Sequence, residues 1–158
     1  MTQAATKAQV AAFGAVISIG GVTGATGTET FTPIGEIVGT AKVSGMKFAS
    51  ADVSTFASNV KRKVGTMVDY GTVTFTTLRV SNDAGQAAVV AACATGQLYD
   101  FKIQLVPNTA AGQATTGDLI AFSALVTEAG GFDMDMNKAS EYSFTLDIDG
   151  VWTVTEGS

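Results

Sequence analysis

Polar and apolar residues alternate in several parts of the chain, and each alternating run predicts a β-strand with one buried face. Threonine alternates with apolar residues over 71–80, and a second run, 97–107, ends at a proline. Two further runs cover 119–126 and 142–155. In the last run one set of alternating side chains is apolar and is expected to face the core: Tyr142, Phe144, Leu146 and Ile148.

A single short helix is predicted over residues 82–95, between the first two of these strands. Asn82 or Asp83 is a suitable N-cap, and Gly96 stands where a glycine commonly ends a helix. The segment is rich in small residues, which allow a helix to approach a sheet closely. The predicted packing face consists of alanines: Ala84, Ala87, Ala88, Ala91 and Ala92.

The first apolar segment, residues 10–22, is weighed against a signal peptide or a membrane span. It is too short to cross a bilayer, and only Lys7 precedes it as a positive charge. We therefore predict a strand, preceded by a flexible arm at residues 1–12. One face of this strand would carry Phe13, Ala15, Ile17 and Ile19.

Residues 20–65 have weaker patterns, in three consecutive stretches. Residues 20–30 are rich in glycine and threonine, which predicts a loop. Residues 31–46 predict a long strand with a bulge or strong bend, because glycines interrupt it. Residues 47–65 have little periodicity and predict a long loop, which in a compact domain is usually functional or disordered.

The composition fits one domain, 1–158, that assembles with other chains. Only 15% of the residues are charged, against roughly 25% in an average soluble domain, and glycine is abundant. A surface with so little charge suggests that neighbouring chains cover much of it. The net charge of −5 argues against a protein that grips nucleic acid, which needs clustered basic residues. The one basic cluster, Lys61-Arg62-Lys63, is either a solvated loop or a contact to an acidic neighbour.

Several classes of catalytic and metal site lack the residues they need. Histidine is absent and Cys93 is the single cysteine, so the common zinc sets, Ser-His-Asp and Cys-His sites and an intrachain disulfide are excluded. Cys93 is expected to be a small buried residue. No glycine-rich phosphate loop is present. We predict no enzyme activity, no catalytic residue, no cofactor and no metal site.

Two short motifs imitate known sites. Asp133-x-Asp135-x-Asn137 matches the opening of a calcium loop, but Lys138 stands where that loop needs glycine, so a structural turn is favoured. Ser44-x-x-Lys47 has the spacing of penicillin-recognising serine enzymes without their other motifs, and we interpret it as chance.

The final run contains two carboxylates and the only tryptophan. Asp147 and Asp149 share a strand face and could in principle carry out acid–base chemistry. We favour a simpler interpretation, in which Asp149-Gly150 is a hairpin turn and Asp147 lies on a solvated face. Trp152 is expected to anchor the sheet or an interface.

The order and spacing of these elements resemble the major tail tube proteins of long-tailed bacteriophages. The resemblance covers nearly the whole chain. It rests on the strand ending at Gly45-Met46, the Asp52-Val53-Ser54 turn, the stretch 65–71 that leads into the threonine-alternating strand, the short helix, and a final Gly-x-Trp-x-Val strand. It implies a mainly β fold: a β-sandwich of two packed antiparallel sheets, flanked by one short α-helix.

The resemblance also implies how the subunits assemble. Hexameric rings, each with a continuous inner β-barrel, would stack into a tube through which DNA passes without sequence-specific binding. The loop 47–65 would reach an adjacent ring, and tape-measure and terminator proteins would be further partners in the virion tail. The expected interface residues are Lys47, Asp52, Lys61, Arg62, Lys63, Asp69, Thr72, Thr74 and Thr76.

Two alternatives stay open at this point. One is the related tube component of a contractile injection or secretion system, which moves effectors instead of a genome. The other, from a different class, is a surface carbohydrate-binding β-sandwich. That class favours exposed aromatic side chains, whereas this chain has one tryptophan and three tyrosines.

Overall fold

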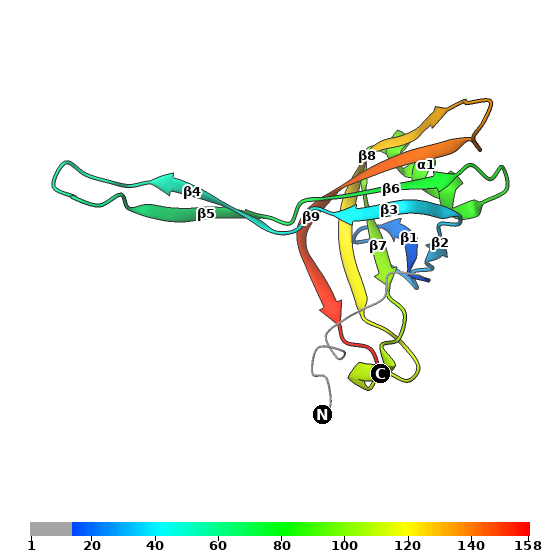
Figure 1. Ribbon diagram of the computed structural model, residues 1–158, viewed down its shortest axis with the longest axis horizontal. Coiled ribbons are helices and arrows are strands. Elements are labelled where there is room, and N and C mark those ends of the chain that lie inside the picture. The colour runs from blue at the N-terminus through cyan, green and yellow to red at the C-terminus, as the bar shows by residue number, and fades with distance from the viewer. Residues whose placement is uncertain (1–13) are drawn as a thin grey trace.

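The structure is a computed structural model that describes residues 14–158. Seven of its strands form one antiparallel sheet in the order β2-β1-β7-β8-β9-β6-β3, and two form a separate sheet, β4-β5 (Figure 1). The first group is β1 (Val16–Val22), β2 (Thr32–Pro33), β3 (Ile37–Val43), β6 (Thr72–Leu78), β7 (Leu98–Gln104), β8 (Leu119–Asp133) and β9 (Glu141–Thr155). The second is β4 (Lys47–Asp52) and β5 (Lys63–Asp69); the helices are α1 (Ala84–Thr95) and a 3-10 turn, Thr109–Ala111.

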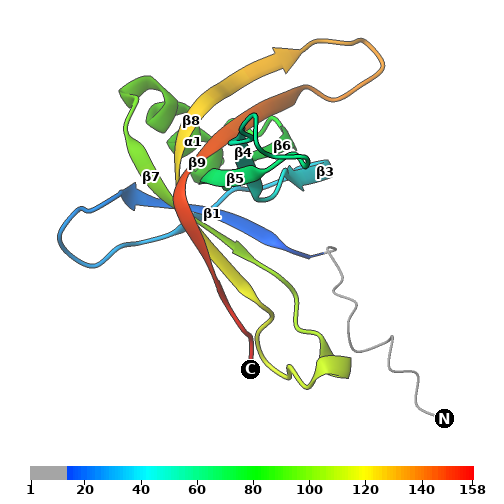
Figure 2. The same ribbon diagram turned by 90° about the vertical axis from the view of Figure 1, so that its left-hand side faces the viewer.

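The large sheet curls around a single core. β8 and β9 are each 15 residues long and bend strongly along their length (Figure 2). Apolar side chains from both ends of the sheet therefore reach the same interior. Phe75 stacks on Phe144 with ring centroids 5.2 Å apart, and Phe101 stacks on Phe122 at 5.8 Å. The expected mainly β fold with one short helix is confirmed.

Alternation correctly identified the buried face of the strands. Val73 and Phe75 of β6 are buried, and Ile17 and Ile19 of β1 are buried as predicted. In β9, Phe144, Leu146 and Ile148 are buried and Tyr142 is half-buried. The prediction for Phe13 lies outside the described residues, as does the predicted arm, 1–12.

The helix has the predicted ends but a different packing face. Asp83 is the N-cap, and Gly96 adopts the left-handed conformation at the C-terminus. The predicted alanine face is wrong, because Ala84, Ala87 and Ala91 are exposed. The helix carries small residues on every face, so the positions of its alanines could not identify the buried face. The buried residues are Gly85, Gln86, Val89 and Ala92.

The predicted loop 47–65 is instead most of a β-hairpin. β4 and β5 pair antiparallel, with Lys47 opposite Asp69 and Asp52 opposite Lys63, and the register shifts once, between Phe48 and Ser50. Both strands are exposed on both faces, so their sequence does not alternate between polar and apolar. The pattern that identifies half-buried strands was therefore absent here.

The C-terminal strands are longer than predicted, and one predicted turn is wrong. Asp149-Gly150 lies inside β9, not at a hairpin turn, and β8 continues seven residues past Val126 to Asp133. Three register shifts between β8 and β9 indicate bulges that absorb the bend of these strands. The bend predicted for 31–46 is present: the stretch divides into β2 and β3, and β3 has a register shift between Val38 and Lys42. Among residues 14–158, no helix is both long and apolar enough to span a bilayer.

Candidate assembly interface

The β4–β5 hairpin projects away from the rest of the molecule (Figure 1). Two contacts fix the point where the chain leaves the large sheet. The Ser44 N–H donates to the Thr72 carbonyl at 2.9 Å, and the Thr72 N–H donates to Ser44 Oγ at 2.8 Å. Beside them the Tyr70 ring packs edge-on against Trp152, with centroids 5.5 Å apart. The base of the hairpin is thus held to the body, whereas its length is not covered.

Apolar side chains are unusually accessible on this hairpin. Phe56 is fully exposed, Phe48 is 66% exposed and Met67 is 77% exposed. An isolated two-stranded hairpin is at best marginally stable in water, and exposed apolar surface often marks a protein–protein contact. The remaining exposed large apolar residues in this segment and at its base are Met46, Val53, Val60, Val64 and Val68.

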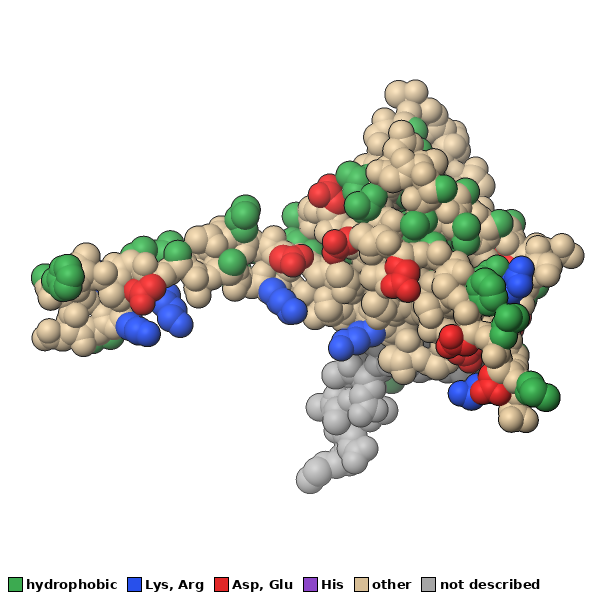
Figure 3. Space-filling model, turned by 90° about the horizontal axis from the view of Figure 1, so that it is seen from above, with side chains coloured by type: hydrophobic (Ala, Val, Ile, Leu, Met, Phe, Trp, Pro, Cys, Tyr) green, Lys and Arg blue, Asp and Glu red, His purple; other side chains and the backbone are tan. Residues whose placement is uncertain are grey.

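The hairpin also differs from the rest of the chain in charge. Residues 47–69 contain four basic and two acidic side chains, whereas the remainder contains five basic and twelve acidic ones. The segment is therefore positive on an acidic protein. In the space-filling view, hydrophobic groups line one side of the hairpin, and most of its charged groups lie on the other side (Figure 3).

The distal end of the hairpin has an ordered set of hydrogen bonds. The Val53 N–H donates to the Arg62 carbonyl and the Arg62 N–H donates to Ser54 Oγ, both at 2.9 Å. The Ser54 N–H donates to Asp52 Oδ1 at 2.9 Å. Hydrogen bonds from the Ser54 hydroxyl and N–H lower the pKa of the Asp52 carboxyl below its ordinary value.

The three predicted threonines lie on the body. Thr72, Thr74 and Thr76 occupy the face of β6 opposite the buried Val73 and Phe75. Their cross-strand partners on β9 are also polar: Asp147, Thr145 and Ser143. Together they form a polar, hydroxyl-rich face, and we call these six residues the threonine face.

Both edges of the large sheet are accessible for pairing. β3 has no neighbour on its outer side among the described residues. At the opposite edge, β2 has only two residues and pairs with Ser18 and Ile19 of β1, so it covers little of that strand. Open β edges expose unpaired N–H and carbonyl groups that accept a further strand.

The structure divides the predicted interface residues into three groups: at the base of the hairpin, on the distal hairpin and on the body. Lys47 and Asp69 lie at the base of the hairpin, while the threonines lie on the body. The exposed apolar residues of the hairpin, Phe56 above all, were missed. Scattered valine, methionine and phenylalanine in a segment without periodicity were the available signal. The predicted residues of the distal hairpin are Asp52, Lys61, Arg62 and Lys63.

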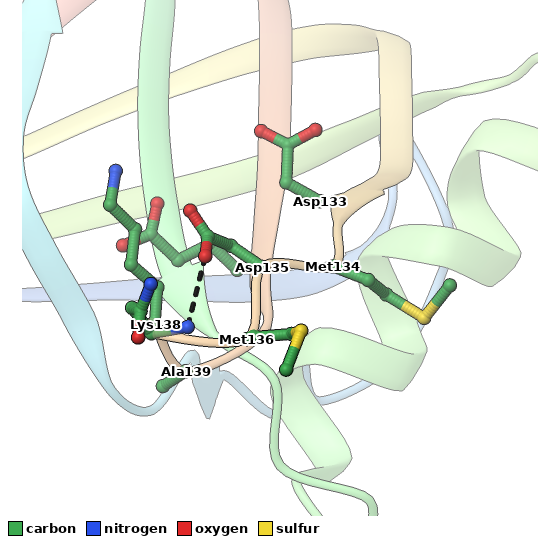
Figure 4. Close-up of a pocket in the computed structure, with 8 residues that line it drawn as sticks. Asp133, Met134, Asp135, Met136, Lys138 and Ala139 are labelled. Carbon is green, nitrogen blue, oxygen red and sulfur yellow. Dashed lines mark hydrogen bonds between the residues drawn. The ribbon is translucent and has the colours of Figure 1, made fainter.

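The motif that resembles a calcium loop forms the turn between β8 and β9, as predicted. The Asn137 N–H donates to Asp135 Oδ1 at 2.9 Å, and the Lys138 N–H donates to the Asp135 carbonyl at 3.3 Å. Met134 and Met136 extend to the other side of the turn from Asp135 (Figure 4). Within residues 14–158, no group of three or more His, Cys, Asp or Glu side chains is arranged to hold a metal ion.

No protein-family model matches the sequence, and no curated protein matches it. The fold, in contrast, matches solved structures of tubes and tails over nearly the whole chain. The SPP1 tail tube matches with a TM-score of 0.65 at 16% identity, covering 95% of this chain and 80% of that chain. The sheath–tube complex of PVC, an extracellular contractile injection system, gives 0.66 at 12%, covering 99% of each chain. The tail of an empty gene transfer agent particle, refined with C6 symmetry, gives 0.61 at 12%, covering 98% and 99%. The chain therefore has the fold of tail tube proteins.

Proposed function

We propose that this protein is a structural, non-enzymatic subunit of a bacteriophage tail tube, in which hexameric rings stack into a conduit. The observation that carries the proposal is the projecting hairpin. It presents an apolar and positively charged surface, and the body it projects from has a tail tube fold. A second copy would cover the apolar groups that a monomer leaves in water.

Ring closure is the second part of the proposal. The open edge at β3 and the lightly covered edge at β2–β1 lie at opposite ends of the strand order. Pairing one edge with the other on a neighbouring copy is a head-to-tail contact, and such contacts close into rings when the rotation between copies is suitable. Sixfold closure is supported by the C6 symmetry of the gene transfer agent tail.

The threonine face supplies a suitable lumen wall. Its side chains are hydroxyls and the Asp147 carboxylate. Glu128 lies alongside, where Oε2 accepts from Thr145 Oγ1 at 3.4 Å, and Lys42 of β3 lies opposite Thr74. A wall with one lysine beside two carboxylates has no basic cluster to hold phosphates, so DNA could pass without strong adhesion. Thr74→Lys together with Thr145→Lys is expected to make assembled tubes bind DNA in a salt-dependent manner.

Electron microscopy of the purified protein tests the assembly directly. Wild-type protein is expected to form rings or tubes, either alone or when a tail initiator complex is supplied. Because Ser44 and Thr72 are hydrogen-bonded, residues 47–69 can be replaced by a short Asn-Gly turn without straining the body. This variant is expected to fold, by circular dichroism, but not to stack. A matched variant, Phe56→Ser with Val60→Ser, keeps the hairpin and removes its apolar end. Wild-type protein that stays monomeric both alone and with the initiator complex would contradict the proposal.

A tube component of a contractile injection system is the second candidate. It is supported by the PVC match, which has the same quality as the match to the SPP1 tail tube. Related assemblies include a sheath/tube terminator, a tube-terminating cap and a baseplate, so terminator, cap and baseplate proteins are expected partners in either case. The tape-measure partner stays a prediction from the resemblance. The contents of native particles distinguish the two: DNA in the lumen supports a virion tail, and protein cargo supports an injection system.

A further inference from the structure

The distal hairpin needs a receptor of matching chemistry. It combines Phe56 and Val60, both largely exposed, with the basic residues Lys61, Arg62 and Lys63. An apolar contact would cover the exposed ring of Phe56, and an acidic surface would complement the three positive charges. A receptor must offer both within the reach of a few residues.

The turn between β8 and β9 has this combination. Phe132 is 52% exposed, Met134 is 86% exposed and Met136 is fully exposed. The same turn contributes Asp133, Asp135 and Glu141 against one lysine, Lys138. Residues 133–139 and Glu141 line an open hollow of about 530 Å³ (Figure 4). Flexible methionine side chains adapt readily to an aromatic partner.

The turn is held in place from behind. The Arg79 guanidinium lies 5.7 Å from the Phe132 ring centre and 5.4 Å from the Tyr142 ring centre. The Arg79 N–H also donates to the Ser140 carbonyl at 2.8 Å. The hollow is thus supported by Arg79, the residue that directly follows β6, and is not formed by a free loop.

The two surfaces lie at different ends of the molecule. The hairpin points away from the body in one direction, and the β8–β9 turn lies on the far side of the body from the hairpin tip (Figure 1). The hairpin therefore cannot fold back onto its own turn, but it can reach the turn of another copy. A contact between different surfaces of identical chains is repeated from copy to copy and propagates an assembly.

Other acidic positions fit less well. Asp147 and Glu128 lie on or beside the threonine face, where the neighbouring side chains are hydroxyls and Lys42. That surface has carboxylates but no large exposed apolar group to receive Phe56. The β8–β9 turn has both.

We propose that the distal hairpin of one copy docks against the β8–β9 turn of a second copy, with Phe56 and Val60 against Met134 and Met136. The basic cluster then lies against Asp133, Asp135 and Glu141. This inference rests on the proposed function in that it names the partner surface of the hairpin, and it concerns a single contact between two copies.

Disulfide trapping between two different proteins tests the contact independently of ring formation. In a Cys93→Ser background, one protein carries Val60→Cys and the other carries Met136→Cys. The two are mixed under mild oxidation and the mixed disulfide is followed on a non-reducing gel. We expect it to form at least tenfold faster than with a control protein carrying Val151→Cys, another exposed valine. Equal rates would overturn the contact.

Charge reversal supplies the second test. Arg62→Glu with Lys63→Glu, or Asp133→Lys with Asp135→Lys, is expected to weaken association by about tenfold or more at low salt. A chain carrying all four changes is expected to recover, because each contact again joins opposite charges. No loss in either double variant, or loss without recovery in well-folded chains, would overturn the pairing.

Microscopy separates this inference from the proposed function. Rings or tubes without the cysteine 60–136 disulfide would leave the proposed function standing and reject this contact. The disulfide without rings or tubes would support the contact and reject the tube.

Discussion

The Asp83 carboxylate joins the start of the helix to Gly35, a residue 48 positions earlier in the chain. Asp83 Oδ1 accepts from the Gln86 N–H at 2.9 Å, and Oδ2 accepts from the Gly35 N–H at 3.1 Å. One side chain therefore caps α1 and fixes the link between β2 and β3. A side chain at residue 35 would collide with this carboxylate, so glycine permits the contact.

Asp83→Ala is expected to lower the free energy of unfolding by about 1–3 kcal/mol, because it removes the cap and leaves the Gly35 N–H without its acceptor. Asp83→Asn keeps one amide oxygen as acceptor and is expected to lose less. Urea unfolding followed by circular dichroism measures both variants. The substitution Asn82→Ser at the neighbouring position is the control and is expected to have little effect on stability. A loss for Asp83→Ala no greater than for that control would show that the carboxylate does not stabilise the fold.

The helix and the hairpin show what the sequence could and could not predict. Asp83 and Gly96 act locally, so the helix ends were predictable from residue type alone. Its buried face was not, because Gln86 is buried through long-range contacts: its Nε2 donates to the Leu78 carbonyl at 2.8 Å and to the Gly35 carbonyl at 3.1 Å. These partners are close only after folding.

The hairpin failed as a prediction for a different reason. A strand is recognised in a sequence by the alternation between a solvent-exposed face and a buried face. Both faces of β4 and β5 are exposed in the single chain. Within it, the Phe48 ring covers Gly65 of the opposite strand, a contact that no periodicity predicts. The residues expected at an interface were predicted from the resemblance. Phe56 and the β8–β9 turn, in contrast, were identified only by their exposure in the structure.

Thr77→Val is expected to stabilise the protein. Thr77 is fully buried on β6, and its Oγ1 is the one buried side-chain polar atom without a hydrogen-bond partner in the described part of the chain. Valine has nearly the same shape and removes this uncompensated hydroxyl, so we expect a gain of roughly 1 kcal/mol. Thermal and urea unfolding measure it. Thr74→Val, at an exposed position of the same strand, is the control and is expected to change stability by less than about 0.5 kcal/mol. Destabilisation by Thr77→Val would mean that the hydroxyl has a partner.

The turn at Asp52 is expected to be sensitive to acid. Its pKa lies below the ordinary value of 3.8 because Ser54 donates hydrogen bonds to the ionised form. A lowered folded pKa stabilises the turn above pH 3.8, and this contribution is lost as the pH falls through the folded pKa. Titration of the Asp52 carboxyl carbon by NMR measures the shift. Ser54→Ala is expected to return the pKa towards 3.8, whereas Ser58→Ala, farther along the turn, is expected to leave it unchanged. An Asp52 pKa that does not respond to Ser54→Ala would refute this assignment.

Gly71 is expected to be essential where the chain passes from the hairpin into the large sheet. Its φ is +86°, which side-chain-bearing residues rarely adopt, and its N–H donates to Asp69 Oδ1 at 2.8 Å. A methyl group there would also collide with Ser44 Oγ and the Gly45 carbonyl, and so disturb the Ser44–Thr72 pairing.

Gly71→Ala is therefore expected to destabilise the protein by about 2–4 kcal/mol, the sum of left-handed strain and steric conflict. Gly150→Ala is the matched control: its φ is +73°, but no atom lies within 4 Å of the added methyl group, so only the strain of about 1–2 kcal/mol is expected. Urea unfolding gives both values, and hydrogen exchange at Ser44 and Thr72 reports the local effect. Gly71 lies where the chain passes from the hairpin into the large sheet and so sets the direction of the hairpin. Gly71→Ala is therefore also expected to impair assembly at protein concentrations where Gly150→Ala assembles normally. Equal losses of stability in the two variants would show that the contacts around Ser44 impose no steric constraint at Gly71.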